Sequence, residues 1–139
     1  MNYSVFKYVI SGLFFLLFIN CNRATIPSQF EGNWQLVHIY EENTDLLNND
    51  SEMIIIVDYM IVDKYGNFIM DLLTIDEQIK GELIINDSDN YITIKSASNP
   101  KFNNRYEMDT TFLNDGYTTI TELLLISDKL QIVARKQSN

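Results

Sequence analysis

In the segment Leu130-Gln131-Ile132-Val133-Ala134-Arg135, two kinds of position alternate along the chain. Leu130, Ile132 and Ala134 share one face of an extended backbone, and Gln131, Val133 and Arg135 share the other. Successive side chains of a β-strand point to opposite faces of the sheet, and here the first face is apolar throughout while the second is mixed. The period of two therefore predicts a strand with one face against a core.

Similar β-rich runs recur along the chain, separated by turn residues, and from Asn33 onward no apolar pattern with the helical period is long enough for a major helix. The expected strands are Asn33–Tyr40, Met53–Asp63, Asn67–Leu73, Ile79–Asn86, Tyr91–Ser98, Arg105–Phe112, Tyr117–Ser127 and Lys129–Lys136. Short polar links rich in Gly, Asn and Asp join antiparallel neighbours. We therefore predict an all-β domain of about eight antiparallel strands in up-and-down order, either a barrel or a β-sandwich.

Two runs, Met53–Val57 and Leu123–Ile126, are apolar at every position, so we expect both faces of these strands to be buried. The outer face needs a cover, because an exposed run of this kind promotes aggregation. Candidates for the cover are the Leu46-Leu47 segment, expected as a one-turn helix or a flap, another protomer, or a membrane surface.

The chain has 139 residues, of which 46% are hydrophobic, with a formal net charge of −9. These values fit one globular domain, which we place at residues 30–139. Loss of Lys7 with an N-terminal leader takes the charge to −10. Such a charge repels phosphate backbones, so nucleic acid is not expected as a partner.

Residues 1–20 have the layout of an export signal, with one cation, Lys7, before the apolar segment Val9–Ile19. Eleven or so helical residues rise about 16 Å, which is short of the roughly 30 Å hydrocarbon core of a bilayer. The pattern favours cleavage after export over a permanent spanning helix.

The single cysteine follows directly, and Phe18-Ile19-Asn20-Cys21 resembles the lipobox of bacterial lipoproteins. The resemblance implies that Cys21 carries lipid such as palmitate, that residues 21–29 form a tether, and that the membrane is a partner. By resemblance to the enterobacterial sorting rule, the absence of Asp after the cysteine, where Asn22 stands, implies the outer membrane of a Gram-negative envelope. The alternative is a free thiol at the end of an uncleaved anchor.

The first expected strand contains Gly32-Asn33-Trp34, and the last one ends in Arg135. With Val62-Asp63-Lys64-Tyr65-Gly66-Asn67-Phe68 and Lys80-Gly81-Glu82-Leu83-Ile84-Ile85, this order resembles the small bacterial lipoproteins of the lipocalin-like family, the calycin superfamily. The resemblance implies an eight-stranded barrel in which Arg135 packs across the indole of Trp34 and closes the ring.

Enzymatic and metal chemistry have little support in the sequence. His38 is the only histidine, so no convincing Ser-His-Asp or Cys-His arrangement or zinc set remains, and no catalytic residue, metal or cofactor is expected. The acidic stretch Asn86–Asn90 lacks the glycine and distal glutamate of a calcium loop. Asp58 interrupts an apolar strand, either as an outward or edge charge or as a buried carboxylate with a raised pKa.

We therefore expect a membrane-anchored, non-enzymatic envelope lipoprotein that binds a small hydrophobic molecule, or alternatively a protein-interaction module with a filled barrel and an unidentified partner. The residues expected to line a ligand site are Leu36, His38, Tyr40, Phe68, Met70, Tyr91 and Tyr106. With Tyr117, three of these tyrosines are candidates for the rim of an open end. Most expected inward side chains are large, which favours a weak ligand or none.

Overall fold

The computed structural model describes residues 23–47, 57–85, 90–114 and 116–138. Within these residues the chain forms nine strands and two short 3-10 helices. The elements are η1 (Ser28–Phe30), β1 (Gly32–Glu41), β2 (Thr44–Asp45), β3 (Asp58–Val62), β4 (Asn67–Leu72), β5 (Glu77–Ile85), β6 (Tyr91–Lys95), η2 (Pro100–Phe102), β7 (Asn104–Asn114), β8 (Thr119–Ile126) and β9 (Leu130–Ser138).

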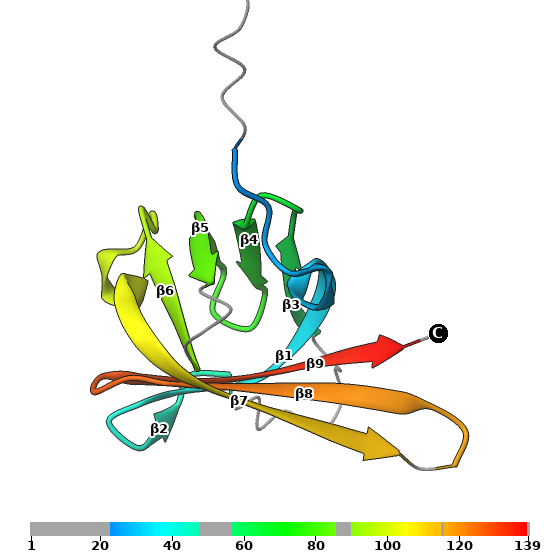
Figure 1. Cartoon of the computed structure of the whole chain (residues 1–139). Coiled ribbons are helices and arrows are strands. Elements are labelled where there is room, and N and C mark those ends of the chain that lie inside the picture. The colour runs from blue at the N-terminus through cyan, green and yellow to red at the C-terminus, as the bar shows by residue number, and fades with distance from the viewer. Residues whose placement is uncertain (1–22, 48–56, 86–89, 115, 139) are drawn as a thin grey trace, which may run out of the picture.

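The strands pair antiparallel in the order β2-β1-β3-β4-β5-β6-β7-β8-β9, and β1 pairs with β9 as well. The described residues thus form a closed eight-stranded barrel, with β2 as an extra strand beside β1 (Figure 1). The prediction of an all-β, up-and-down barrel is confirmed, and the β-sandwich is excluded. Residues 53–56 of the second expected strand lie outside the described residues, and β3 begins at Asp58.

Two strands change partners along their length and so bend the barrel. The first half of β1, residues 32–36, pairs with β3, and residues 35–41 pair with β9. Likewise β7 pairs with β6 at residues 104–107 and with β8 at residues 107–114. In Figure 1 the bends are seen in the strand directions: β7, β8 and β9 run across the direction of β3 to β6.

A β-bulge at the bend of β1 changes which side chains face inward. Leu36 pairs with Ala134, but the next partner, Val133, lies opposite His38, so Val37 is the extra residue. Beyond the bulge Ile39 is fully buried, while His38 and Tyr40 lie on the outer face, where their rings stack 5.2 Å apart. The expectation that His38 and Tyr40 line the interior is wrong, because one inserted residue reverses the alternation.

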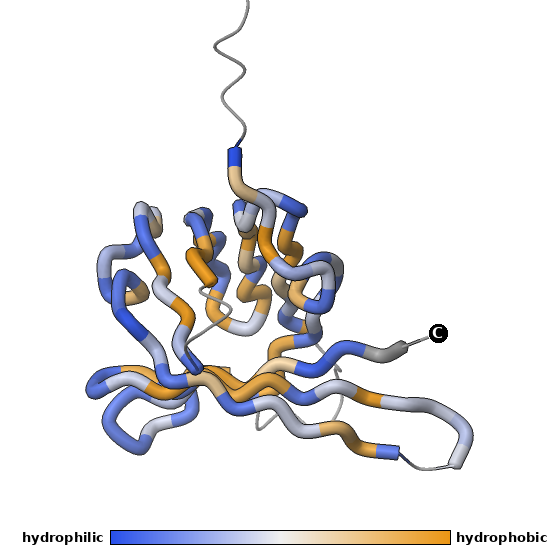
Figure 2. Tube along the Cα trace, in the orientation of Figure 1, coloured by the Kyte–Doolittle hydropathy of each residue, from blue (hydrophilic) through white to orange (hydrophobic). Residues whose placement is uncertain are grey.

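Large side chains fill the barrel interior. The largest fully buried ones are Trp34, Tyr106, Phe68, Phe102, Ile39, Met60, Met70, Leu72, Ile79, Ile92, Ile94 and Leu123. They belong to one hydrophobic cluster, and the strands in Figure 2 alternate between apolar and polar residues as this cluster requires. The interior is therefore a packed core.

One of the all-apolar runs is only partly covered. In β8, Leu123 and Leu125 are buried, but Ile126 is 42% exposed. Of the other run, residues 53–56 lie outside the described part, and Val57 is 43% exposed. The expectation that both faces of these strands are buried is therefore wrong for Ile126 and Val57. The Leu46-Leu47 segment forms a turn after β2 rather than a helix, and it buries Leu47 in the core cluster.

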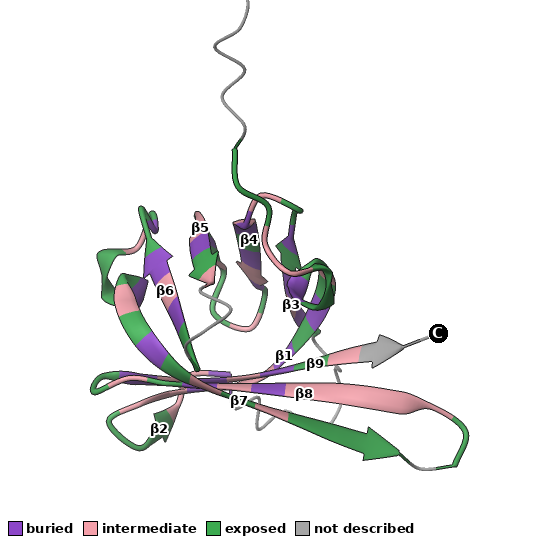
Figure 3. Cartoon of the chain, in the orientation of Figure 1, coloured by how far each residue is buried: buried purple, intermediate pink, exposed green. Residues whose placement is uncertain are grey.

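The sheet formed by β7, β8 and β9 continues beyond the closed part of the barrel. Past Glu107 no described strand pairs with β7 on the side of β6, and β9 pairs with β1 only as far as Arg135. Figure 3 shows that the far part of β7 is exposed. The extension carries Phe112 at 71% and Leu113 at 41% exposure, which are high values for apolar side chains.

The segment before β1 lies against the barrel. The backbone N–H of Ile26 donates to the carbonyl of Lys64 over 2.9 Å, and the Arg23 guanidinium donates to the side chain of Asn67 over 2.8 Å. These contacts lie within the described part of the tether that we predict at residues 21–29. The two hydrogen bonds hold Arg23 and Ile26 along the turn between β3 and β4.

Candidate functional site

A hollow of about 530 Å³ lies where the extension leaves the barrel, and we call it the end hollow. Its lining comes from η1, β1, β7, β8 and β9. The lining residues are Gln29, Phe30, Trp34, Thr110, Phe112, Thr121 and Lys136. Aromatic walls with two hydroxyl groups and one ammonium are the usual mixture of a small-molecule site.

The strand register explains why these residues meet. Phe112 in β7 pairs with Thr121 in β8, and Thr121 pairs with Lys136 in β9, so the three side chains share one face of the extension. That face continues the inward face of the barrel, because Leu123 and Ala134, two residues further along, are buried. The extension therefore forms one wall of the end hollow.

The opposite wall is buried and hydrogen-bonded. The indole Nε1 of Trp34 donates to the carbonyl oxygen of Phe30 over 3.0 Å, and both residues are buried. This hydrogen bond fixes η1 across the end of the barrel and satisfies the polar atom of the indole, as a buried tryptophan requires. Phe112, on the rim, is by contrast mostly exposed.

The cation over Trp34 is Lys136 and not Arg135. The Nζ atom of Lys136 lies 5.6 Å from the centroid of the Trp34 ring and donates to the carbonyl oxygens of Glu31 and Gln29. Arg135 points to the outer face and forms an ion pair with Glu122 over 2.7 Å. The prediction that Arg135 packs across Trp34 is therefore wrong by one residue. Lys136 lies on the same inward face of β9 as Ala134, and Arg135 lies on the opposite face. Closure of the barrel by β1 and β9 is nevertheless present.

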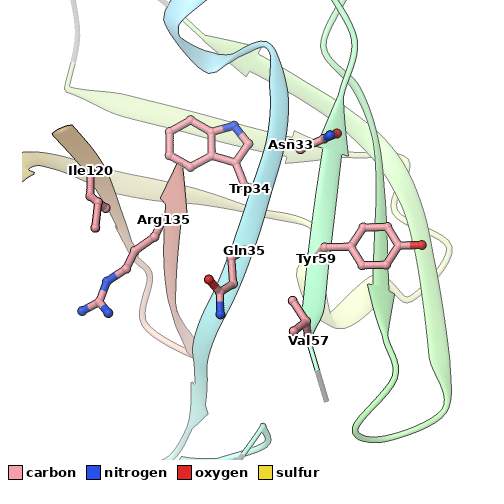
Figure 4. A pocket seen from close by; sticks show the side chains of 7 residues that line it. All are labelled: Asn33, Trp34, Gln35, Val57, Tyr59, Ile120 and Arg135. Carbon is pink, nitrogen blue, oxygen red and sulfur yellow. The ribbon is translucent and has the colours of Figure 1, made fainter. Parts of the chain in front are cut away.

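A second hollow, of about 520 Å³, lies on the outer face of the barrel where β1 leaves β9. Its lining includes Gln35 and Arg135, which are paired residues of neighbouring strands, together with Val57, Tyr59 and Ile120 (Figure 4). The hydroxyl of Tyr59 donates to Asp71 over 2.8 Å. This hydrogen bond is the largest influence that raises the pKa of the Tyr59 phenol.

The other expected lining residues divide between the core and the outer face. Leu36, Phe68, Met70 and Tyr106 point inward but are parts of the packed core. Burial raises the pKa of the Tyr106 phenol far above its usual range, and its hydroxyl donates to the carbonyl oxygen of Phe102 over 2.9 Å. Tyr91 is 39% exposed, with Arg105 Cζ 4.0 Å from its ring centroid. None of these five lines the end hollow. Sequence reasoning missed Phe112 and Lys136.

The carboxylates of Asp58 and Asp45 both have structural partners. Asp58 is 4% exposed, and its oxygens accept hydrogen bonds from the backbone N–H and the hydroxyl of Thr74 over 2.9 and 2.5 Å. The expected outward charge is therefore wrong. Asp45 lies 2.6 Å from Nδ1 of His38 and also accepts hydrogen bonds from the backbone N–H groups of Ile39 and Leu47, so this pair fastens the β1–β2 hairpin.

Among the described residues, no three His, Cys, Asp or Glu side chains gather in a way that would hold a metal ion. The described helices are also too short to cross a bilayer. Cys21 and the stretch Asn86–Asp89 lie outside the described residues. No protein-family model, no curated protein and no solved structure matches this chain.

Proposed function

We propose that the protein is a membrane-anchored, non-enzymatic lipocalin-like lipoprotein of the cell envelope, which binds a small hydrophobic molecule weakly in the end hollow. The closed barrel, behind a leader that resembles that of bacterial lipoproteins, carries this proposal. The lipobox-like residues before Cys21 support lipid anchorage. Asn22, in place of Asp after the cysteine, supports a location in the outer membrane. Two acyl chains hold a domain stably on a bilayer, whereas one chain does not.

The anchor is tested by growing cells that express the full chain with a labelled fatty acid. We expect the label to enter the wild-type protein and to be absent from the Cys21→Ser variant, because no other residue offers a thiol. Equal labelling of the two proteins would refute the anchor. Ser11→Ala, which changes the apolar leader but keeps Cys21, is the control and should retain the label.

Ligand binding is assigned to the end hollow rather than to the barrel axis, because the axis is filled by the core. An apolar ligand in the hollow would lie against Phe112, with the Thr110 and Thr121 hydroxyl groups within the same wall. Trp34 is the only tryptophan of the chain and lines the hollow, so its fluorescence is a direct reporter.

The binding test is a titration of the Cys21→Ser chain, from residue 21 onward, with a medium-chain fatty acid. We expect a saturable change in Trp34 fluorescence, weakened by Phe112→Ser at the rim of the hollow. Tyr91→Ser, which removes an exposed ring away from the hollow, is the matched control. A titration that does not saturate, or an equal loss of fatty-acid affinity in both variants, would refute binding in the end hollow.

The second candidate function is protein interaction, and the edge of β7 favours it. Residues 109–114 have no described strand partner on one side, and Phe112 and Leu113 are exposed there. An unpaired edge can add an extended segment from another protein as a further strand. A photo-crosslinking residue at Thr111 would then capture a discrete partner in the envelope, whereas one at Ile69, on the outer face of β4, would not.

A further inference from the structure

The first described residues are fastened to one end of the barrel, which limits how the protein can sit on a membrane. Arg23 donates to Asn67, and Ile26 donates to the carbonyl oxygen of Lys64. Ile26 also packs close to Gly66, since its Cγ2 atom lies 3.1 Å from where a Cβ on that glycine would be. The chain is thus held at the turn between β3 and β4 before it enters η1.

Only Asn22 separates Cys21 from Arg23 in the sequence. Because an extended chain spans at most about 3.6 Å per residue, the two Cα atoms lie within about 7 Å of each other. A lipid on Cys21 therefore brings Arg23, and the turn to which it is bonded, to the level of the lipid headgroups. A long flexible tether would not impose this, but Arg23 and Ile26 are hydrogen-bonded to the turn between β3 and β4.

The side chains at this end suit a headgroup layer. The Arg23 guanidinium carbon lies 5.6 Å from the centroid of the Tyr65 ring, and Lys64 Nζ lies 4.9 Å from it. Tyrosine rings favour the interface between water and lipid, and lysine and arginine bind lipid phosphates. We call Arg23, Lys64 and Tyr65 the basal cluster.

Charge alone would not draw this end to the membrane. Glu82 lies 3.5 Å from Arg23, and Asp63 is in the same turn as Lys64, so the acids offset the two cations. The whole chain is strongly acidic and is repelled by an anionic bilayer. The attachment must therefore come from the N-terminal anchor, and the basal cluster determines the orientation.

We propose that the basal cluster is the membrane-facing surface of the protein and contacts phospholipid headgroups. The proposal rests on the proposed membrane attachment of Cys21. It places the layer of β7, β8 and β9 away from the bilayer, because in Figure 1 this layer lies at the opposite end of the molecule from the first described residues, which precede η1. The projecting extension and its end hollow then face the aqueous compartment.

The test uses the chain beginning at Cys21, which contains every described contact, coupled through its thiol to a maleimide lipid in phosphatidylcholine vesicles. A new tryptophan is introduced by Tyr65→Trp in one variant and by Tyr117→Trp, on the β7–β8 turn, in the other. Vesicles with brominated acyl chains quench tryptophans that reach the membrane. Wild-type protein, with Trp34 alone, supplies the background.

We expect brominated lipid to reduce the added fluorescence of Tyr65→Trp and to leave that of Tyr117→Trp unchanged. Equal quenching of the two variants, or stronger quenching of Tyr117→Trp, would overturn the orientation. A flexible Gly-Ser insertion between Asn22 and Arg23, combined with Lys64→Glu, should abolish the difference. Quenching of Tyr65→Trp that survives both changes would show that the basal cluster is not what orients the protein.

Chemical coupling separates this proposal from the proposed function. If fatty-acid labelling in cells fails but the coupled protein shows the expected quenching, the natural anchor is refuted and the geometry of the basal cluster stands. If labelling succeeds and the quenching pattern is reversed, the lipoprotein assignment stands and the orientation is refuted.

Discussion

Lys136 lies over the ring of Trp34, with Nζ 5.6 Å from the ring centroid, and so joins the last strand to the first. The same ammonium group donates to two carbonyl oxygens at η1. A single side chain thus connects β9, β1 and η1 at the end of the barrel.

Lys136→Met should lower the free energy of unfolding by about 1 to 3 kcal/mol, because it removes a cation–π contact and two charged hydrogen bonds. Arg135→Met, one residue earlier, should lower it by at most about 1 kcal/mol, since the pair with Glu122 is exposed to solvent. Urea unfolding of both variants measures the difference. A larger loss from Arg135→Met would contradict the assignment of Lys136.

Asp58 and Thr74 should be energetically coupled, because the buried carboxylate accepts two hydrogen bonds from that one residue. We expect Asp58→Asn and Thr74→Val each to cost about 1 to 3 kcal/mol, with a coupling energy of about 1 kcal/mol in a double-mutant cycle. Asp109→Asn, at an exposed position, is the matched control. Strictly additive losses would mean that the two side chains act independently.

Gly66 and Gly116 both have positive φ, 85° and 89°, but their surroundings differ. A Cβ on Gly66 would lie 2.3 Å from the carbonyl oxygen of Leu83, whereas nothing lies within 4 Å of one on Gly116. Gly66→Ala should therefore destabilise the barrel by about 1 to 3 kcal/mol more than Gly116→Ala, which carries only the backbone strain. Thermal unfolding of the two variants gives the comparison, and equal losses would rule out the close approach as the cause.

Asp63 should make the protein sensitive to acid. Partial burial, the largest single influence, acts to raise the pKa of this carboxyl group, but the hydrogen bonds from Asn67 and Tyr65, with the charge of Arg23, together lower it below 3.8. A carboxyl group whose pKa is lower in the folded state adds stability above its unfolded pKa and loses it as the pH falls through the folded value.

Wild-type protein should accordingly lose more stability than Asp63→Asn when the pH falls from about 5 to about 3. Urea midpoints at the two pH values measure this loss. Asp109→Asn removes the same charge from an exposed site and should follow the wild type. If Asp63→Asn retained the full acid sensitivity, the hydrogen bonds at this turn would not be its source.

Local patterns predicted most of the barrel. Alternation located the strands, and Asp63 and Gly66 marked the β3–β4 turn, because an Asp side chain that binds backbone N–H groups and a glycine at positive φ are local requirements. The alternation in β9 also predicts that Lys136 faces inward, because it lies two residues after Ala134. The family resemblance implies an Arg or Lys of the last strand packed across Trp34, and on that basis Arg135 was the residue predicted.

Other features depend on contacts that no local pattern shows. The bulge at Val37 turned His38 and Tyr40 outward, and its only trace in the sequence is the spacing of Leu36 and Ile39. Asp58 accepts hydrogen bonds from Thr74, sixteen residues further on, so its burial could not be inferred from its own strand. The β1–β2 hairpin uses Glu42 and Asn43 at positive φ, where glycine would have been the clearer signal.

The pairing of Gln35 with Arg135 has a consequence for how the protein folds. All other neighbours in the barrel are consecutive or nearly consecutive strands, so hairpins can form as soon as their residues are available. The seam between β1 and β9 joins the far ends of the domain and must overcome the largest loop-closure entropy. Until β9 is in place, β1 and β8 each keep an open hydrogen-bonding edge, and the apolar face of the unfinished sheet stays accessible to chaperones or to other copies of the chain.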